Sequence, residues 1–247
     1  MADDITKTKH DITKHRPSNA PSDLTVRKPK RDPACDIDAF VQRSRAIQSA
    51  RRAQAQRGRL VFALDATASR QPTWDMAMQL QAEMFEEVRN LDVQLVFYRG
   101  IGECQASGWV SSGERLANLM TKITCRAGET QIRKVLAHAR RECEKAKVTL
   151  VFIGDAIEEK IDELAATAAE LGRLGVRAFM FQEGADDDVE TAFREIARLS
   201  GGAYCRFDAS APRHLAELLR AVAAFTVGGI KALEAKPGAV KLLEQLS

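Results

Sequence analysis

The chain has 247 residues, of which 45% are hydrophobic, so it is long enough to bury a substantial core without covalent staples. Its five cysteines are odd in number and form no C-x-x-C pair, which gives no support to a disulfide framework or a zinc cluster. No segment approaches the roughly 18 uninterrupted apolar residues of a membrane span, and the charged first residues precede no apolar stretch. We therefore expect a soluble, cytoplasmic protein.

The formal net charge of +3 is unevenly distributed along the chain. Residues 1–57 contain 13 Lys and Arg against 7 Asp and Glu, whereas residues 58–247 contain 24 against 27. A basic N-terminal segment can contact nucleic acid or an acidic partner. The run RKPKR at 27–31 has no interleaved aromatic residue that could stack on bases. A solvated tail is therefore favoured over a nucleic-acid-binding one.

Four segments follow from the pattern of apolar residues. Residues 1–34 are polar and show no hydrophobic period, so they are predicted to be a disordered basic tail. Residues 35–57 have a helical stripe and form a predicted N-terminal helical extension. Residues 58–225 form the main predicted domain, and 226–247 form a C-terminal helical extension that is interrupted near Pro237 and Gly238.

Within residues 58–225, short apolar runs alternate with amphipathic segments of helical length. The runs are typical of strands that are buried on both faces of a parallel sheet, at 59–66, 93–100, 148–156, 176–182 and 203–209. Helices are expected between them, at 72–90, 128–147, 156–175 and 186–202. The segment 103–110 follows the second strand too closely for a crossover, so it should return as an antiparallel hairpin. The pattern predicts a doubly wound α/β domain whose mostly parallel sheet has one antiparallel edge strand.

Oxygen-bearing side chains follow the ends of the predicted strands. Asp65, Thr67 and Ser69 lie at the end of the first strand, Thr130 precedes a helix, and Asp155 ends the strand at 148–156. Ligands of doubly wound sheets bind beyond the carboxyl ends of the strands, where the strand order reverses. Two carboxylates and three hydroxyls are hard ligands that suit Mg²⁺ or Mn²⁺ and do not suit zinc or copper.

The five residues and their chain order resemble the metal-ion-dependent adhesion site of the von Willebrand factor type A (VWA) family, which has an Asp-x-Ser-x-Ser loop and a distant Thr and Asp. The resemblance covers about residues 58–225 and includes the hairpin edge strand. It implies a Rossmann-like VWA fold in which Thr67 and Ser69 bind the cation directly. Thr130 would bind it directly or through water, and Asp65 and Asp155 largely through water. Thr67 stands where the family usually has Ser.

A function without catalysis is expected, because the sequence offers oxygen ligands without a convincing nucleophile, general base or Gly-rich phosphate loop. The resemblance implies how such a module would bind a partner. An acidic group of a protein partner would complete the coordination of Mg²⁺ or Mn²⁺, so the expected function is cation-dependent protein–protein interaction. The alternative is that the chain keeps the fold of the family but that its metal site is vestigial and binds no cation. The sequence does not indicate the identity of the partner or the oligomeric state.

Other interpretations of the same residues stay open at this point. Ser69 or Thr73 could cap a helix that starts near Pro72. Asp65 and the segment GDAIEEKID at 154–162 also suggest a Mg²⁺-dependent phosphatase or phosphotransferase of the haloacid-dehalogenase type. That family requires a second Asp two residues after its nucleophile, where this chain has Thr67. The third alternative is a nucleic-acid-binding protein with a basic tail.

Overall fold

The computed structural model describes residues 42–45, 57–70, 75, 90–208, 212–236 and 239–246. The chain divides into two units, Met1–Ala46 and Ile47–Ser247, and residues 42–45 of the first are helical. The predicted tail at 1–34 and most of the extension at 35–57 lie outside the described residues. So does the helix expected at 72–90, except for Asp75, which is helical, and Asn90, which is in a turn.

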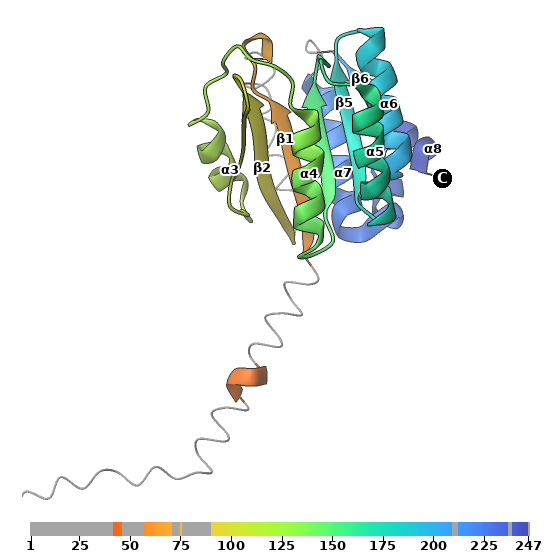
Figure 1. The fold of residues 1–247 in the computed structure, drawn as a ribbon. Coiled ribbons are helices and arrows are strands. Elements are labelled where there is room, and N and C mark those ends of the chain that lie inside the picture. The colour runs from red at the N-terminus through yellow and green to blue at the C-terminus, as the bar shows by residue number, and fades with distance from the viewer. Residues whose placement is uncertain are drawn as a thin grey trace, which may run out of the picture. The chain divides into compact units, whose positions relative to one another are not determined.

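The second unit is built around a six-stranded sheet with the order β3-β2-β1-β4-β5-β6 (Figure 1). The strands are β1 Gly58–Asp65, β2 Leu91–Arg99, β3 Glu103–Ala106, β4 Thr149–Gly154, β5 Arg177–Glu183 and β6 Ala203–Phe207. Neighbouring strands are parallel except β2 and β3, which form the predicted antiparallel hairpin at one edge. The predicted α/β class and mostly parallel sheet are therefore confirmed.

Helices cover both faces of this sheet (Figure 1). The helical elements are η1 Ala68–Arg70, α3 Gly113–Met120, α4 Ile132–Cys143, α5 Ile161–Arg173, α6 Asp187–Ser200, α7 Pro212–Glu234 and α8 Val240–Leu246. In the figure, α4, α5 and α6 lie in front of the sheet and α7 lies behind it. Within the described part of the chain, no helix has the length and apolar character that a membrane crossing requires.

Two of these helices add to the sequence-based prediction. The eight-residue helix α3 was not predicted, because it is too short to establish a period, although Leu116 and Met120 are buried in the core and Leu119 packs against it. The predicted division at residue 225 falls inside α7, which continues to Glu234 through a kink at Gly229 (φ 68°).

The strands are apolar on both sides because each side of the sheet supports its own core. In β1, Leu60, Phe62 and Leu64 join the cluster on the α7 side. Val61 and Ala63 alternate with them and join the cluster under α4, α5 and α6. All five are buried, as expected for a central strand covered by helices on both faces.

Candidate metal centre

The strand order brings the two aspartates of the predicted site to one place. Strands β1 and β4 are neighbours at the centre of the sheet, and the chain extends outward in opposite directions from them. Asp65 is the last residue of β1, and Asp155 directly follows Gly154, the last residue of β4. Both carboxylates therefore lie at the topological switch point, where doubly wound sheets open a crevice for ligands.

Short polar contacts link four of the five predicted ligands. Asp65 is only 2% exposed, and its Oδ1 accepts a hydrogen bond from the Thr67 backbone N–H at 2.8 Å. The Thr67 Oγ1 and Ser69 Oγ lie 3.3 Å apart. Ser69 Oγ in turn donates to Asp155 Oδ2 at 3.3 Å. The short turn η1 thus directs the Ser69 hydroxyl toward the loop after β4, and the oxygens of both loops converge.

Thr130 lies in an adjacent network. It is 7% exposed, and its backbone N–H donates to Glu158 Oε2 at 2.8 Å. In return, the Glu158 backbone N–H donates to Thr130 Oγ1 at 3.0 Å. These reciprocal bonds tie the loop before α4 to the loop that follows Asp155. The structure therefore connects Thr130 to the site through Glu158, and shows no direct contact between Thr130 and the Asp65, Thr67 and Ser69 side chains among the hydrogen bonds it describes.

Glu159 reinforces the same connection between loops. Its carboxylate accepts hydrogen bonds from the backbone N–H groups of Ile132 at 2.6 Å and Arg133 at 2.9 Å. These groups belong to the first turn of α4, whose own N-cap, Gln131, makes no side-chain capping bond. A carboxylate there satisfies unpaired amides and opposes the positive end of the helix dipole. The sequence indicated an acidic segment here, but gave no sign that it caps a helix 27 residues away.

Tyr98 is a second residue that sequence reasoning did not assign to the site. It pairs with Asp65 in the register of β1 and β2, and its side chain is fully buried. Burial raises the pKa of the Tyr98 phenol well above its usual value, and the carboxylates of Asp65, Glu159 and Asp155 raise it further. Three carboxylates therefore favour the neutral form of one buried phenol at the inner wall of the site.

The donor set fits a hard divalent cation. Asp65, Asp155 and the hydroxyls of Thr67 and Ser69 offer oxygen only, which matches the preference of Mg²⁺ and Mn²⁺. Among the residues the structure describes, no three His, Cys, Asp or Glu side chains gather into a metal-binding group. Because two of the ligands are hydroxyls, this arrangement needs only two carboxylates, and Mg²⁺ commonly keeps several of its waters.

Substituting Glu159 provides a test of the loop connection. Glu159→Gln is expected to lower the free energy of unfolding by about 1–2 kcal/mol, because a neutral amide caps the first turn of α4 less well than a carboxylate. Glu163→Gln removes the same charge from the neighbouring α5, where Glu163 forms an exposed ion pair with Arg133 at 3.3 Å. That control should change stability by less than about 0.5 kcal/mol. Equal effects in urea denaturation would contradict the capping role of Glu159.

His138, in the middle of α4, serves the packing of that helix. Its Nε2 lies 2.8 Å from Oε1 of Gln94 on β2. Burial lowers the pKa of His138 below its ordinary value, so the ring is favoured in the neutral form. The contact joins α4 to the sheet at a distance from the carboxyl ends of the strands.

Solved structures with the same fold include VWA domains. The VWA domain of SpRpn10 has a TM-score of 0.52 and 11% identity, over 64% of this chain and 94% of that chain. BatB from Bacteroides thetaiotaomicron has a TM-score of 0.53 and 18% identity, over 68% and 98%. An aerotolerance-related membrane protein from Bacteroides fragilis has a TM-score of 0.52 and 19% identity, over 66% and 98%.

The likeness is one of structure. No protein-family model matches the sequence, and no curated protein matches it either. The chain has the VWA-like Rossmannoid fold that the resemblance implied, and at these identities the likeness concerns the fold alone.

Proposed function

We propose that this chain is a cytoplasmic protein-binding module whose contact surface includes a Mg²⁺ or Mn²⁺ ion at the carboxyl ends of β1 and β4. The observation that carries the proposal is the continuous contact from Asp65 through Thr67 and Ser69 to Asp155, across the switch point of the sheet. These residues come from two loops that are 86 positions apart at the Ser69–Asp155 contact.

Each side chain has a separate role in holding the cation. The Thr67 and Ser69 hydroxyls would bind it directly, and Asp65 and Asp155 would hold its waters. Thr130, fixed by Glu158, would stand at the side of the α4 loop. When bound, the cation supplies a positive centre that an acidic group of a partner protein can coordinate. The protein's own part is to hold these oxygen ligands in place, through the contacts among Asp65, Thr67, Ser69 and Asp155 and through the bonds between Thr130 and Glu158.

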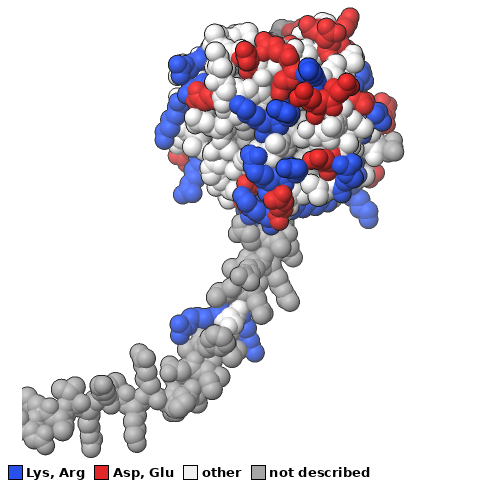
Figure 2. All heavy atoms as spheres, viewed as in Figure 1, with Lys and Arg blue, Asp and Glu red and all other residues white. Residues whose placement is uncertain are grey.

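The charge of the surrounding surface makes this interaction depend on the cation. Figure 2 shows Asp and Glu side chains gathered along the upper edge of the visible face, the edge at which the parallel strands end in Figure 1. An acidic partner group would be repelled there unless a divalent ion offset the charge. Removal of the cation by a chelator is therefore expected to abolish binding. Binding through a neutral contact surface would not depend on the cation in this way.

The acidic segment that suggested a phosphotransferase has a structural use. Glu158 and Glu159 bind backbone amides at the start of α4, so their carboxylates hold two loops together. The antiparallel strand β3 also matches the VWA-like fold. These observations support the binding module over a phosphatase, and a phosphatase panel in which turnover depends on Asp65 would reverse that preference.

Affinity capture tests the proposed function. The full chain is immobilised and incubated with lysate in Mg²⁺, and the retained proteins are eluted with EDTA and identified by mass spectrometry. We expect a specific set that Ser69→Ala loses by about tenfold or more, because that variant removes one hydroxyl ligand from an exposed position. The control Thr121→Ala removes an exposed hydroxyl at the end of α3 and should retain the same set. The proposal would be overturned if the same proteins are retained in the presence of EDTA and by the Ser69→Ala variant.

A further inference from the structure

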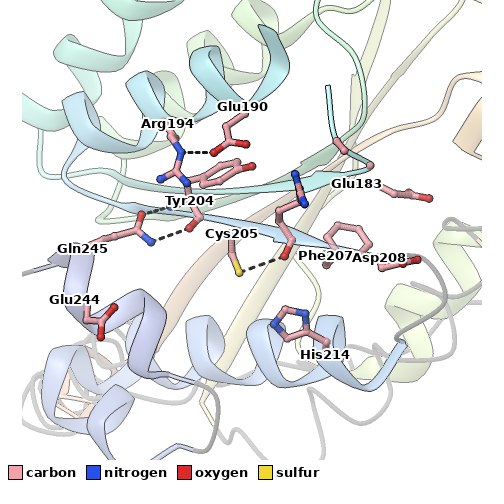
Figure 3. Close-up of a pocket in the computed structure, with 13 residues that line it drawn as sticks. Glu183, Glu190, Arg194, Tyr204, Cys205, Phe207, Asp208, His214, Glu244 and Gln245 are labelled. Carbon is pink, nitrogen blue, oxygen red and sulfur yellow. Dashed lines mark hydrogen bonds and ion pairs between the residues drawn. The ribbon is translucent and has the colours of Figure 1, made fainter. Parts of the chain in front are cut away.

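A cleft of about 940 Å³ opens along the outer edge of the sheet, at strand β6 (Figure 3). It lies apart from the candidate metal centre, because β5 stands between β4 and β6. Its floor is formed by β6 residues from Tyr204 to Phe207, and its walls come from α6, α7 and α8. The outer edge of β6 pairs with no further strand in the described residues.

A side chain already imitates a neighbouring strand at one end of this edge. The Tyr204 backbone N–H donates to Gln245 Oε1 at 2.7 Å, and the Gln245 Nε2 donates to the Tyr204 carbonyl oxygen at 2.8 Å. Figure 3 shows both bonds, which a strand's peptide groups would otherwise make. The pair establishes that the backbone groups of Tyr204 point away from β5 and toward the cleft.

The strand geometry extends this conclusion to Arg206. Backbone groups of alternate residues point to the same side of a strand, so the N–H and C=O of Arg206 also face the cleft. Its carbonyl oxygen accepts a contact from the Cys205 thiol at 3.6 Å, a weak donor that leaves the oxygen able to accept a peptide N–H. The Gln245 amide bonds the backbone of Tyr204, and among the hydrogen bonds of the described residues none occupies the backbone N–H of Arg206, so that N–H is available for pairing.

The charge of the cleft indicates the kind of segment that would pair there. Four carboxylates line it, and they belong to Glu183, Glu190, Asp208 and Glu244. Two guanidinium groups oppose them, those of Arg206 and Arg194, and Arg194 is held by Glu190 at 2.7 Å and stacks 4.4 Å from the ring of Tyr204. The balance is negative and favours a basic ligand.

We infer that β6 accepts an extended, basic segment of a partner protein as an added strand. This strand would pair with the backbone of Arg206, on the same outer edge of β6 where Gln245 bonds the backbone of Tyr204. Backbone hydrogen bonds to the edge would give affinity, and Lys or Arg side chains would meet the carboxylates of the cleft. The site is independent of the cation, because its ligands are peptide groups and none of the five metal-site residues lines the cleft.

Fluorescence polarisation with a synthetic probe tests the inference on the full chain. The probe is a labelled peptide of about eight residues in which Lys and Thr alternate, a common strand length. It should bind equally with and without EDTA. The same peptide with N-methyl groups on alternate amides keeps its charge and loses its strand donors, so it should bind at least about tenfold more weakly. A peptide alternating Glu and Thr should not bind.

Two substitutions at one position separate backbone pairing from charge. Arg206→Pro removes the outward N–H, which an edge strand tolerates, whereas Arg206→Ala keeps it. We expect the Pro variant to bind the Lys–Thr probe about tenfold more weakly than the Ala variant. Gln245→Ala exposes the Tyr204 groups and should tighten binding by about threefold.

Each outcome decides the question. Three results would overturn the inference. They are no binding of the Lys–Thr probe, binding of the N-methylated peptide as tight as that of the unmethylated probe, and the same affinity of Arg206→Pro and Arg206→Ala for the probe. If Arg206→Pro does not fold, the N-methylated peptide tests the same hydrogen bonds on the unchanged chain.

Discussion

Saturating Mg²⁺ or Mn²⁺ is expected to raise the Tm of the full chain by about 5–10 °C, and EDTA should reverse the rise. A ligand that binds only the folded state at about 100 times its Kd stabilises that state by about 2.7 kcal/mol. For a domain of this size each kcal/mol moves Tm by about 2–4 °C. The physical source is the closeness of the Asp65 and Asp155 carboxylates, whose loops are connected by the contacts of Thr67 and Ser69. A divalent cation offsets that negative charge in the folded state only.

Three variants test this expectation by differential scanning fluorimetry. Asp155→Ala should abolish the rise in Tm with little loss of basal stability, because Asp155 lies beyond the last residue of β4 and its side chain is only half-buried. Thr67→Ser should keep the rise, since it retains the hydroxyl and removes only a methyl group. Asp162→Ala, an exposed aspartate in the first turn of α5, serves as the matched control and should respond like the unchanged chain. The absence of any shift or calorimetric heat at millimolar Mg²⁺ and Mn²⁺ would show that the site is vestigial and would remove the cation from the proposed interaction.

Gly128→Ala is expected to lower the free energy of unfolding by about 3 kcal/mol and to remove the Mg²⁺ response. A methyl group at residue 128 would overlap the backbone N, O and Cα atoms of Gly100. Backbone atoms cannot rotate away as a side-chain tip can, so the loop before α4 would have to move. The same two loops are joined by the Glu129 N–H, which donates to the Gly100 carbonyl at 3.2 Å. Moving them displaces Thr130 and, through Glu158, the loop that holds Asp155.

The measurement is urea denaturation, followed by the Mg²⁺-dependent change in Tm. Gly108→Ala provides the matched control, because a methyl group there meets no atom within 4 Å. It should change stability by less than about 0.5 kcal/mol and keep the full response. A Gly128→Ala chain as stable as the Gly108→Ala chain would show that the close approach of the two loops is not required.

Much of the fold could be predicted from the sequence, because parallel strands that are buried on both faces have continuous apolar sequences. The predicted runs at 59–66 and 148–156 correspond to β1 and β4, and the segment at 103–110 contains β3, paired antiparallel with β2. The position of a carboxylate at a strand end was equally predictable, since Asp65 and Asp155 each lie at the carboxyl end of such a run. Helix α3 was missed because a helix of eight residues shows too few turns to establish a period.

By itself, the sequence determined which segments form buried strands, where those strands end to within about two residues, and which oxygens are available at those ends. These are local properties, because a continuous apolar run predicts a strand that is buried on both faces, and alternation of side chains assigns each residue to one face. Only the tertiary structure decided which ends meet. Ser69 contacts Asp155 because β1 and β4 are adjacent strands in the sheet. Glu159, in the loop after β4, bonds the first turn of α4. The packing of α8 beside β6 brings Gln245 to Tyr204, 41 positions away in the chain. Such contacts depend on the order of strands in the sheet, which a pattern of hydrophobic residues does not encode.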